Sequence, residues 1–401
     1  MANQTNVAEQ GKSTISRRSV LKAAMAAGGA AVLGFPAILK AQGPITMRWQ
    51  STWPQKDIFH EFALDLAKKV NEMTGGDLKI EVLPSGAVVP AFGLLDAVSK
   101  GTLDGGHGVL AYHYGKQTAL ALWGSGPVFG MDANMLLSWH KYGGGKELLD
   151  KIYKSIGANV VSFPYGPMPT QPLGWFKKPI TKPDDFKGMK YRTVGLSIDI
   201  FTGLGAAVNA LPGAEIVPAI DRGLLDGAEF NNASSDRALG FPDVSKVCML
   251  QSFHQNTEQF EILFNKTKYD GLPDKLKAII AYAVDAASAD MSWKAVDRYS
   301  KDYVEMQTKD KVRFYKTPDS ILQKQLDTFD AAAAKKASEN PLFKEVFESQ
   351  RHFAERAVKW DLDTNVQRRM AYNHYFGKQA AKPAAPAAKP EAPPAKAEKK
   401  G

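Results

Sequence analysis

The sequence predicts an α/β fold of two similar lobes, with long helices towards the carboxyl end of the chain. Three observations lead to this prediction. Strand and helix patterns alternate from residue 46 onwards, which favours largely parallel sheets. A nine-residue pattern occurs twice, 122 residues apart, which is about one domain length. From residue 273 to about residue 376, the spacing of apolar residues is helical.

The first segments of the folded chain alternate regularly between the two patterns. Residues 46–50, 78–83 and 104–110 are short apolar or alternating runs typical of strands. Residues 60–73 and 92–100 have helical spacing, and each is followed by glycine, which commonly ends a helix. This order predicts an α/β sheet in the first part of the chain.

The repeated pattern is Ala-x-x-basic-Gly-x-Leu-Asp-Gly, at residues 97–105 and again at 219–227. In each copy a helix is expected to end at the first glycine, and the Asp-Gly pair begins a strand. We interpret the copies as equivalent parts of two lobes whose strands end at a common cleft, where ligands of open α/β sheets bind. Chance similarity is the alternative for so short a pattern.

Two segments are predicted to cross between the lobes. The first is the proline-rich run from Pro164 to Pro169, and the second is Ser252 to Thr257, just before a strand at 259–264. Two crossings form a hinge, which allows the lobes to close around a ligand.

These crossings predict the boundaries of the lobes. Lobe I is expected at residues 44–166, with a return segment at about 256–300, and lobe II at residues 167–255. The helices of residues 273–376 are expected to pack across both lobes.

Residues 1–41 have the features of a twin-arginine signal peptide. Arg17 and Arg18 precede a weakly apolar stretch, residues 23–39, and cleavage is expected after Ala41. A membrane anchor is the alternative, but this stretch contains glycine and proline and is short for spanning a bilayer. We therefore expect export to the periplasm and removal of the leader.

The positive charge of the chain, +9, lies almost entirely in its two ends. Residues 1–41 have five basic residues and one acidic, and residues 378–401 have six lysines and two glutamates. The core is close to neutral, so the sequence gives no support for nucleic-acid binding. The composition of residues 377–401, rich in Ala, Pro and Lys, predicts a disordered tail.

The sequence contains none of the common catalytic signatures. Serine-hydrolase, zinc-protease and nucleotide-binding loop motifs are absent, and the seven histidines are scattered. The glycines of residues 203–208 resemble a dinucleotide motif but lie within or after a helix, which argues against it. Cys248 is the only cysteine and is interpreted as a buried apolar residue.

The segment from Gly188 to Phe230 carries the main candidate site. It predicts a strand ending in Arg192, a helix from about Ser197, and a second strand that delivers Glu229. A guanidinium beside a helix N-terminus is suited to binding a carboxylate. A surface arginine without a function is the alternative.

Oxygen donors near the two crossings predict a cation site. Gln171 follows the first crossing and Gln255 lies in the second, so both are expected near Glu229. Such donors suit a hard cation such as Na⁺ or Ca²⁺. Tyr112 and Tyr114 follow the equivalent strand of lobe I, and we expect them either on the opposite wall of the cleft or in the core.

Several of these segments resemble a known family. The leader, Trp49–Pro54, Lys100–Gly105, Gly188–Arg192 and the segment around Glu229 are similar to the periplasmic solute-binding subunits of TRAP (tripartite ATP-independent periplasmic) transporters, the DctP family. The resemblance extends over residues 45–376 and is strongest to receptors for 2-oxo acids and lactate. It implies a two-lobed periplasmic-binding-protein fold with strand exchange at the hinge, and delivery of the solute to a membrane permease.

The resemblance also implies roles for individual residues. Arg192 would bind the substrate carboxylate, and Na⁺ or Ca²⁺ would be held by Gln171, Glu229, the backbone carbonyl of Phe230, and Gln255. The family pattern has Glu-Trp where this chain has Glu229-Phe230, so the metal ligands are kept but the lining of the pocket changes. Asn231 or Asn232 is a further candidate donor to the solute.

The sequence therefore predicts a receptor for a small 2-hydroxy or 2-oxo monocarboxylate, such as lactate or pyruvate, that catalyses nothing. A dicarboxylate, a sugar acid or an aromatic acid is the alternative within the receptor class. An enzyme of the periplasm that uses Glu229 as a base on 2-oxo acids is the alternative outside it. The C-terminal helices are a candidate surface for a homodimer, which the sequence leaves open.

Overall fold

A computed structural model of the protein describes residues 43–377. The predicted leader, residues 1–41, lies outside the described residues, as does the predicted tail after Gly377. Within residues 43–377, no helix combines the length and the apolar character needed to cross a membrane.

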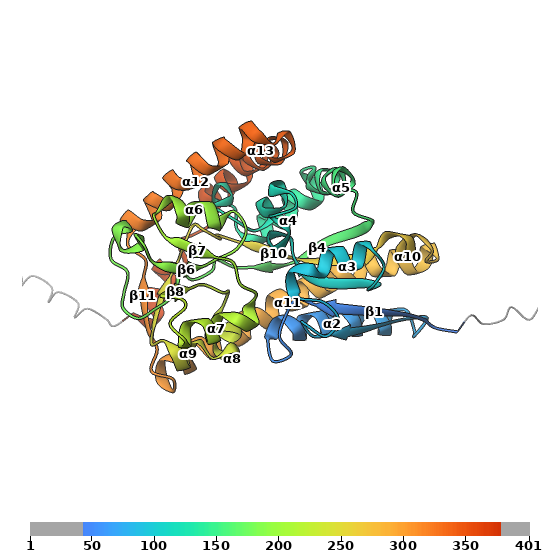
Figure 1. The fold of residues 1–401 in the computed structure, drawn as a ribbon, viewed down its shortest axis with the longest axis horizontal. Helices are drawn as coiled ribbons and strands as arrows, with labels where there is room; N and C mark the ends of the chain where they lie inside the picture. The colour runs from blue at the N-terminus through green and yellow to red at the C-terminus, as the bar shows by residue number, and fades with distance from the viewer. Residues whose placement is uncertain (1–42, 378–401) are drawn as a thin grey trace, which may run out of the picture. The chain divides into compact units, whose positions relative to one another are not determined.

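The described chain forms two β-sheets with helices packed around them (Figure 1). The strand order is β2-β1-β3-β10-β4 in the first sheet and β11-β9-β5-β8-β6-β7 in the second. The strands are β1 (Ile45–Ser51), β2 (Leu78–Leu83), β3 (Gly105–Val109), β4 (Val160–Met168), β5 (Gly174–Phe176), β6 (Lys190–Arg192), β7 (Ala207–Asn209), β8 (Gly227–Ala228), β9 (Val247–Leu250), β10 (Glu258–Asn265) and β11 (Arg313–Lys316).

The helices before residue 274 are short, and three long helices follow. They are α2 (Ile58–Met73), α3 (Leu94–Ser99), α4 (Ala133–Tyr142), α5 (Gly145–Ser155), α6 (Ser197–Gly203), α7 (Gly213–Asp221), α8 (Ala233–Leu239), α9 (Phe241–Val244), α10 (Lys266–Asp270), α11 (Asp274–Thr308), α12 (Asp319–Glu339), α13 (Pro341–Thr364) and α14 (Arg368–Phe376). The strands and helices predicted from the early segments and the repeat are confirmed to within a few residues.

The prediction of largely parallel sheets is wrong for one central strand in each sheet. The strands β1, β2 and β3 pair in parallel, as do β6, β7 and β8. The strand β10 is antiparallel to both of its neighbours, β3 and β4, and β5 is antiparallel to β8 and β9. Each of the two enters its sheet directly after a crossing from the other sheet, so it runs in the opposite direction. This is the strand exchange that the resemblance implies.

The first crossing begins later than the proline run predicts. Pro164 and Pro167 both belong to β4, and the chain leaves the first sheet only after Met168. Because β4 is an edge strand, a proline can lie where no inward hydrogen bond is needed. Gly166, with a φ of +66°, lies where the register of β4 and β10 shifts.

The C-terminal helices pack against elements of both sheets. Helix α11 contacts β4 and α2 on one side and α8 on the other, while α12 contacts α6, and α13 contacts α4 and α5. The chain therefore has the two-lobed fold with long C-terminal helices that the sequence predicts (Figure 1). The residue bounds of lobes I and II stay a prediction.

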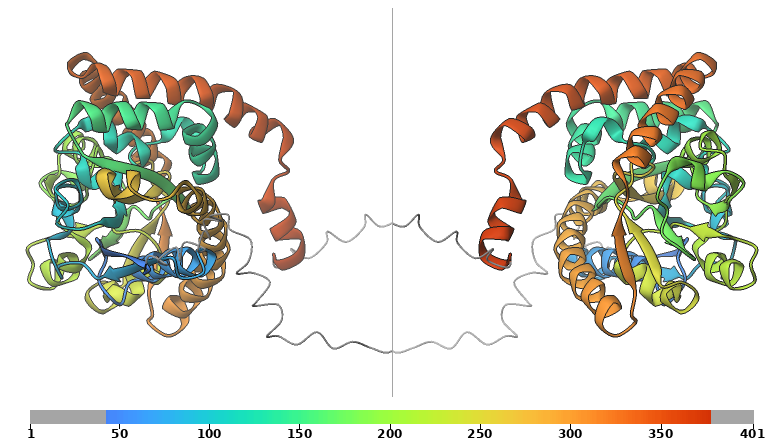
Figure 2. Two further views of the ribbon diagram at one scale, coloured as in Figure 1. Left: turned by 90° about the vertical axis from the view of Figure 1, so that its right-hand side faces the viewer. Right: turned by 90° about the vertical axis from the view of Figure 1, so that its left-hand side faces the viewer.

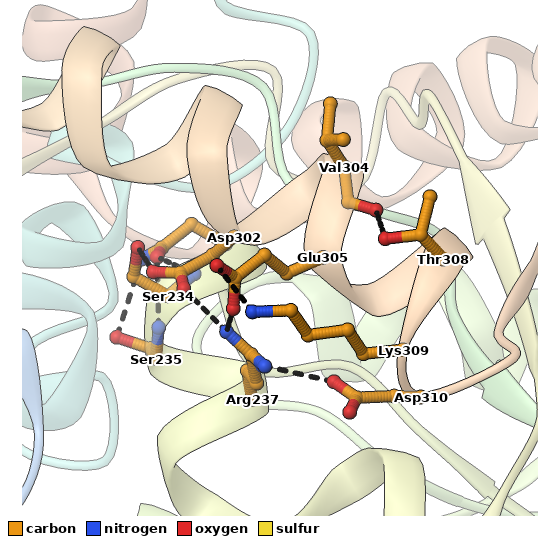
Figure 3. Close-up of polar contacts among 10 residues, drawn as sticks. Ser234, Ser235, Arg237, Asp302, Val304, Glu305, Thr308, Lys309 and Asp310 are labelled. Carbon is orange, nitrogen blue, oxygen red and sulfur yellow. Dashed lines mark hydrogen bonds and ion pairs between the residues drawn. The ribbon is translucent and has the colours of Figure 1, made fainter.

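An ion-pair cluster joins α8 to α11 (Figure 3). The guanidinium of Arg237 lies 3.0 Å from Asp302, 2.5 Å from Glu305 and 2.8 Å from Asp310. The hydroxyl of Ser234 also donates to Asp302. One helix turn of α8 is thus fixed to the end of the longest helix.

The chain after about residue 360 extends away from the sheets. Helix α14 is connected to the end of α13 and lies apart from the other helices in Figure 2. No residue of α14 is buried. Large apolar side chains are exposed along this segment, at Trp360, Leu362, Val366, Met370, Tyr372, Tyr375 and Phe376.

Candidate functional site

Arg192 is the last residue of β6, and its side chain is only 1% exposed. Its Nε donates to the carbonyl of Leu211 at 2.8 Å. Its Nη1 donates to the Glu229 carboxylate Oε1 at 2.8 Å and to the Glu229 backbone carbonyl at 3.0 Å. Its Nη2 is buried and has no hydrogen-bond partner. The guanidinium is therefore held rigidly on one side, with an amino group left for another acceptor.

The turn after Arg192 is fixed against the first lobe and the second crossing. The backbone N–H of Leu196 donates to the Ser125 hydroxyl at 3.3 Å, and the Ser197 hydroxyl donates to the His254 carbonyl at 2.7 Å. Gly195 has a φ of +62°, and a Cβ there would lie 2.5 Å from the Ser125 hydroxyl. Only glycine allows this approach.

Glu229 follows β8 and is fully buried. Because β6 and β8 are parallel, with Arg192 opposite Ala228, the two side chains leave their strands at the same edge. Burial raises the pKa of Glu229, although the guanidinium of Arg192 opposes this effect. Its Oε1 accepts from the guanidinium, and its Oε2 is buried without a partner.

The two glutamines come from the two crossings and meet next to this pair. The backbone N–H of Gln171 donates to the Gln255 carbonyl at 3.2 Å, and both side chains are at most 2% exposed. Each amide oxygen is buried and has no donor. The crossings thus deliver two free oxygen atoms to the same region.

Glu258, the first residue of β10, also belongs to this group, and the sequence analysis missed it. Its Oε2 accepts from the amide nitrogen of Gln171 at 3.4 Å and from that of Gln255. Burial, and then the nearby Glu229, raise its pKa well above the usual range of a glutamate. An acidic residue directly after the second crossing, three positions from Gln255, was the signal available in the sequence.

Of these residues, Gln171, Arg192, Gln255 and Glu258 line one small cavity, with a free volume of about 10 Å³, close to that of a single water-sized sphere. Its wall is formed by Trp53, Phe59, Val109, Tyr112, Gln171, Arg192, Val194, Phe230, Asn231, Gln255 and Glu258. Arg192 is the only basic residue in that wall. The cavity is thus polar on the side of the crossings and aromatic on the other.

Phe230 and Asn231 contribute differently to the wall. The ring of Phe230 lies 5.8 Å from the guanidinium carbon of Arg192 and 5.9 Å from the ring of Phe59. The amide oxygen of Asn231 already accepts from Asn232, whose own oxygen caps α8 by accepting from two backbone N–H groups. Asn232 is therefore a helix cap.

Tyr114 does not join the other predicted residues. Its hydroxyl donates to Asp199 at 2.5 Å, and the ammonium group of Lys336 lies 5.5 Å from its ring. It lines a separate surface depression beside α12. Only Tyr112 of the two tyrosines reaches the cavity.

Two histidines of the first sheet, His107 and His113, are buried but do not line the cavity. The ring of His107 bridges Trp53 and Tyr165. The Nε2 of His113 lies 3.1 Å from a carboxylate oxygen of Glu261 on β10.

The donors around the cavity fit a hard cation. Within residues 43–377, no group of three or more His, Cys, Asp or Glu side chains has metal-binding geometry. The cavity wall has instead three residues with buried oxygen atoms that have no donor, Gln171, Gln255 and Glu258, and a fourth such oxygen belongs to Glu229, the ion-pair partner of Arg192. Amide and carboxylate oxygens are the ligands of Na⁺ and Ca²⁺.

A much larger hollow, about 1220 Å³, borders the small cavity and shares Asn231 with its wall. It is lined by one face of α11, by the start of α4, by Arg368 of α14 and by residues of both crossings, such as Thr170 and Asn256. Gln171, Arg192, Gln255 and Glu258 are not among the residues that line it. The small cavity is therefore the better candidate for recognising a polar solute.

Comparison with known proteins agrees with this fold. Residues 50–340 match the family model of bacterial extracellular solute-binding proteins, family 7, DctP. A monocarboxylate 2-oxoacid-binding periplasmic protein of Nostoc is 32% identical over 334 residues, which cover 79% of this chain and 86% of the relative.

Two solved structures of TRAP periplasmic solute-binding proteins are also similar. One, from Pseudoalteromonas atlantica, contains sodium and pyruvate, and the other, from Colwellia psychrerythraea, contains calcium and pyruvate. Each is 27% identical to this chain, with a TM-score of 0.76, and the match covers 83% of this chain. It covers 99% of the first structure and 100% of the second. From its family match and its two-sheet fold, the chain belongs to the DctP family of TRAP transporter solute-binding proteins.

Proposed function

We propose that the chain binds a small 2-oxo or 2-hydroxy monocarboxylate together with a cation, and delivers it to a TRAP permease. The observation that carries this proposal is the unpartnered Nη2 of Arg192 beside the unpartnered oxygens of Gln171, Glu229 and Gln255. An amino group and a set of oxygens match the two parts of a carboxylate–cation pair.

The division of roles follows from the contacts. Arg192 binds the substrate carboxylate through Nη2, since Nη1 is already used by Glu229. The cation is held by the oxygens of Gln171, Glu229 and Gln255 and by the backbone carbonyl of Phe230. A bound cation supplies positive charge to the carboxylate and to the neighbouring oxo or hydroxyl group. Tyr112 and Asn231 complete the wall, and Tyr114 is left out of the site.

The lining favours a small solute with one carboxylate. The cavity has a single guanidinium and no lysine, and its other wall is made of rings from Trp53, Phe59 and Phe230. A dicarboxylate would bury a second charge without a basic partner, which is costly. The Nostoc relative is described as binding monocarboxylate 2-oxo acids, and both solved structures contain pyruvate.

Calorimetry tests the substrate class. Titration with pyruvate, lactate, succinate, glucuronate and picolinate should give the tightest binding for pyruvate or lactate. Tighter binding of succinate, glucuronate or picolinate would assign the site to a dicarboxylate, a sugar acid or an aromatic acid instead.

The chain is proposed to act as a receptor without catalysis. The carboxylate of Glu229 is held by Arg192, which disfavours its use as a base. Incubation with the same acids, followed by NMR, should show no turnover. Product formation that is lost in Glu229→Gln would establish the enzyme alternative.

Binding is proposed to require movement between lobe I, residues 44–166 and 256–300, and lobe II, residues 167–255. The backbone segments between Met168 and β5, and between β9 and Glu258, are the hinges. The described cavity is too small for any of these acids, so the solute enters only if the hinges open. Small-angle scattering should show a larger radius of gyration without solute than with it.

Export by the twin-arginine route and function in the periplasm are proposed from residues 1–41. Replacing both Arg17 and Arg18 by lysine should keep the protein in the cytoplasm. If the amount of protein in the periplasm is unchanged in this variant, the protein is exported by another route.

A homodimer is proposed through the exposed apolar segment that ends in α14. Its large side chains, among them Trp360 and Met370, are exposed, while the large hollow beside α11 is lined by Trp293 and Val296. Because a two-fold axis makes such contacts reciprocal, the α14 of a second copy is the proposed occupant of this hollow. Light scattering should give a dimer for the full chain and a monomer after truncation at residue 364.

A further inference from the structure

We propose that Glu258 gives this site a preference for a divalent cation, Ca²⁺, over Na⁺. The proposal rests on the proposed function, because it specifies the ion that the solute site uses.

The first observation is the position of the Glu258 side chain. It lies in the cavity wall, on the strand that returns from the second crossing, and is 5% exposed. Its Oε2 accepts from the amide nitrogens of both Gln171 and Gln255. One carboxylate oxygen thus orients both amides, and the amide oxygens stay free for the cation.

The second observation is the free oxygen of the same carboxylate. Oε1 of Glu258 is buried and has no donor, as are Oε2 of Glu229 and the amide oxygens of Gln171 and Gln255. A buried carboxylate oxygen without a partner is costly. Three of these atoms belong to residues of one cavity wall and the fourth to the glutamate bonded to Arg192, and a cation that binds all four explains them together.

The third observation is the balance of charge. Glu229 pairs with the guanidinium of Arg192, and Glu258 lies in the same cavity wall as Arg192. A bound cation keeps both carboxylates ionised, and the substrate adds a third negative charge. A divalent cation makes the buried group neutral. A monovalent cation leaves one negative charge without compensation in a site that excludes water.

The neighbouring side chains and the coordination chemistry of the ions also favour Ca²⁺. The carboxylates of Asp57 and Asp236 accept hydrogen bonds from Ser235 and Trp175, and neither donor brings a positive charge to the site. Ca²⁺ accepts six to eight oxygens in flexible geometry, and its affinity rises with the number of charged ligands, whereas Mg²⁺ gives up its water reluctantly.

Glu261 provides a matched control on the same strand. It is also a fully buried glutamate of β10, but its carboxylate is used by Tyr153, Ser162 and His113. Glu258→Gln and Glu261→Gln therefore remove the same charge from the same strand, inside and outside the proposed cation site.

The experiment measures the binding of each ion in the presence of the solute, because the substrate carboxylate is part of the charge balance. Chelator-treated protein in a choline buffer with saturating pyruvate is titrated with CaCl₂ and separately with NaCl, by calorimetry and by tryptophan fluorescence. The wild-type protein should bind Ca²⁺ at least about 100-fold more tightly than Na⁺. Glu258→Gln should weaken Ca²⁺ binding about 10- to 100-fold and change Na⁺ binding only a few-fold, since its amide keeps the shape of the site. Glu261→Gln should keep the wild-type ratio of the two affinities.

The outcomes separate the two proposals. If Na⁺ binds to the wild-type protein as tightly as Ca²⁺, or if Glu258→Gln weakens both ions equally, Glu258 does not select the ion, and the cation-dependent receptor stands. If neither ion binds or affects pyruvate binding, both the preference for Ca²⁺ and the cation of the proposed function are wrong. If Glu258→Gln does not fold, the wild-type ratio alone decides.

Discussion

The Nη1 of Arg192 donates to both the carboxylate and the backbone carbonyl of Glu229, at 2.8 and 3.0 Å. This double contact fixes the position of the guanidinium by main chain as well as by side chain. It also aims the remaining amino group, Nη2, away from Glu229. Parallel pairing of the strands that carry the two residues is what brings them together.

Replacing Arg192 should abolish solute binding. Arg192→Ala removes the proposed carboxylate ligand and leaves Glu229 buried without its partner, which should lower stability by about 3–5 kcal/mol. Arg192→Lys restores the charge but not the planar fork, so binding should remain at least about tenfold weaker. Calorimetry with pyruvate, alongside urea unfolding, separates the two effects. Near wild-type affinity in Arg192→Ala would show that the carboxylate binds elsewhere.

Removing cations should weaken solute binding. In a chelator-treated, sodium-free buffer, the Kd for pyruvate should rise at least about tenfold, because the oxygens of Gln171 and Gln255 then face the carboxylate without a cation between them. Gln255→Leu should give the same loss in the presence of cations. Equal affinity for pyruvate in all these conditions would argue that the solute binds without an ion.

The two tyrosines after β3 should behave differently. Tyr112 lines the cavity, whereas the hydroxyl of Tyr114 is bound to Asp199. Tyr112→Phe should weaken pyruvate binding several-fold if its hydroxyl contacts the solute, at about 1 kcal/mol for a neutral hydrogen bond. Tyr114→Phe is the matched control and should bind normally. A loss in Tyr114→Phe alone would reverse the assignment.

The Arg237 cluster should contribute to stability and not to recognition. Arg237→Ala removes three ion pairs between α8 and the end of α11, and since these groups are partly exposed, the loss should be about 1–2 kcal/mol. High salt should reduce the difference from the wild type. Urea unfolding at two salt concentrations measures this, and an unchanged midpoint would show that the cluster contributes nothing.

Asp57 should make stability depend on pH. It caps α2 through the N–H of Phe59 and accepts from Ser235 on α8, and burial raises its pKa from 3.8 to about 6. The folded state therefore binds this proton more tightly than the unfolded state, so its contribution is present below pH 4 and is lost as the pH rises towards 6. Asp57→Asn keeps both contacts without the charge.

The measurement is the difference in melting temperature between Asp57→Asn and wild type, from pH 4 to pH 7. The variant should become relatively more stable as the pH rises. A difference that is constant across this range would mean that Asp57 keeps its ordinary pKa in the folded protein.

The sequence predicted the residues of the candidate site best where local rules apply. Arg192 and Glu229 were found because a residue after a strand in an α/β fold points to the sheet edge. Glu258 lies between the predicted crossing, Ser252 to Thr257, and the predicted strand, 259–264, and was given no role, although it is the first residue of β10. Its burial depends on Gln171, 87 residues away, and no local pattern records that contact.

The different positions of Tyr112 and Tyr114 have a geometric cause. In a strand, two residues that are two positions apart point the same way. The chain instead forms a 3₁₀ turn at Leu110–His113, in which successive residues rotate by about 120°. The direction of the antiparallel strands was likewise beyond local sequence, because it depends on the order in which the chain visits the two sheets.

The exchanged strands also limit how this protein can be divided. Without β10, the strand β4 loses its only partner in the first sheet, and without β5 the pair β9 and β11 is separated from the rest of the second. Neither half of the chain is a module that could be expressed or transplanted by itself. A biosensor or a receptor of new specificity must therefore be made by replacing side chains around the cavity, and a chimaera that joins lobes of two relatives must keep both exchanged strands with their host sheets.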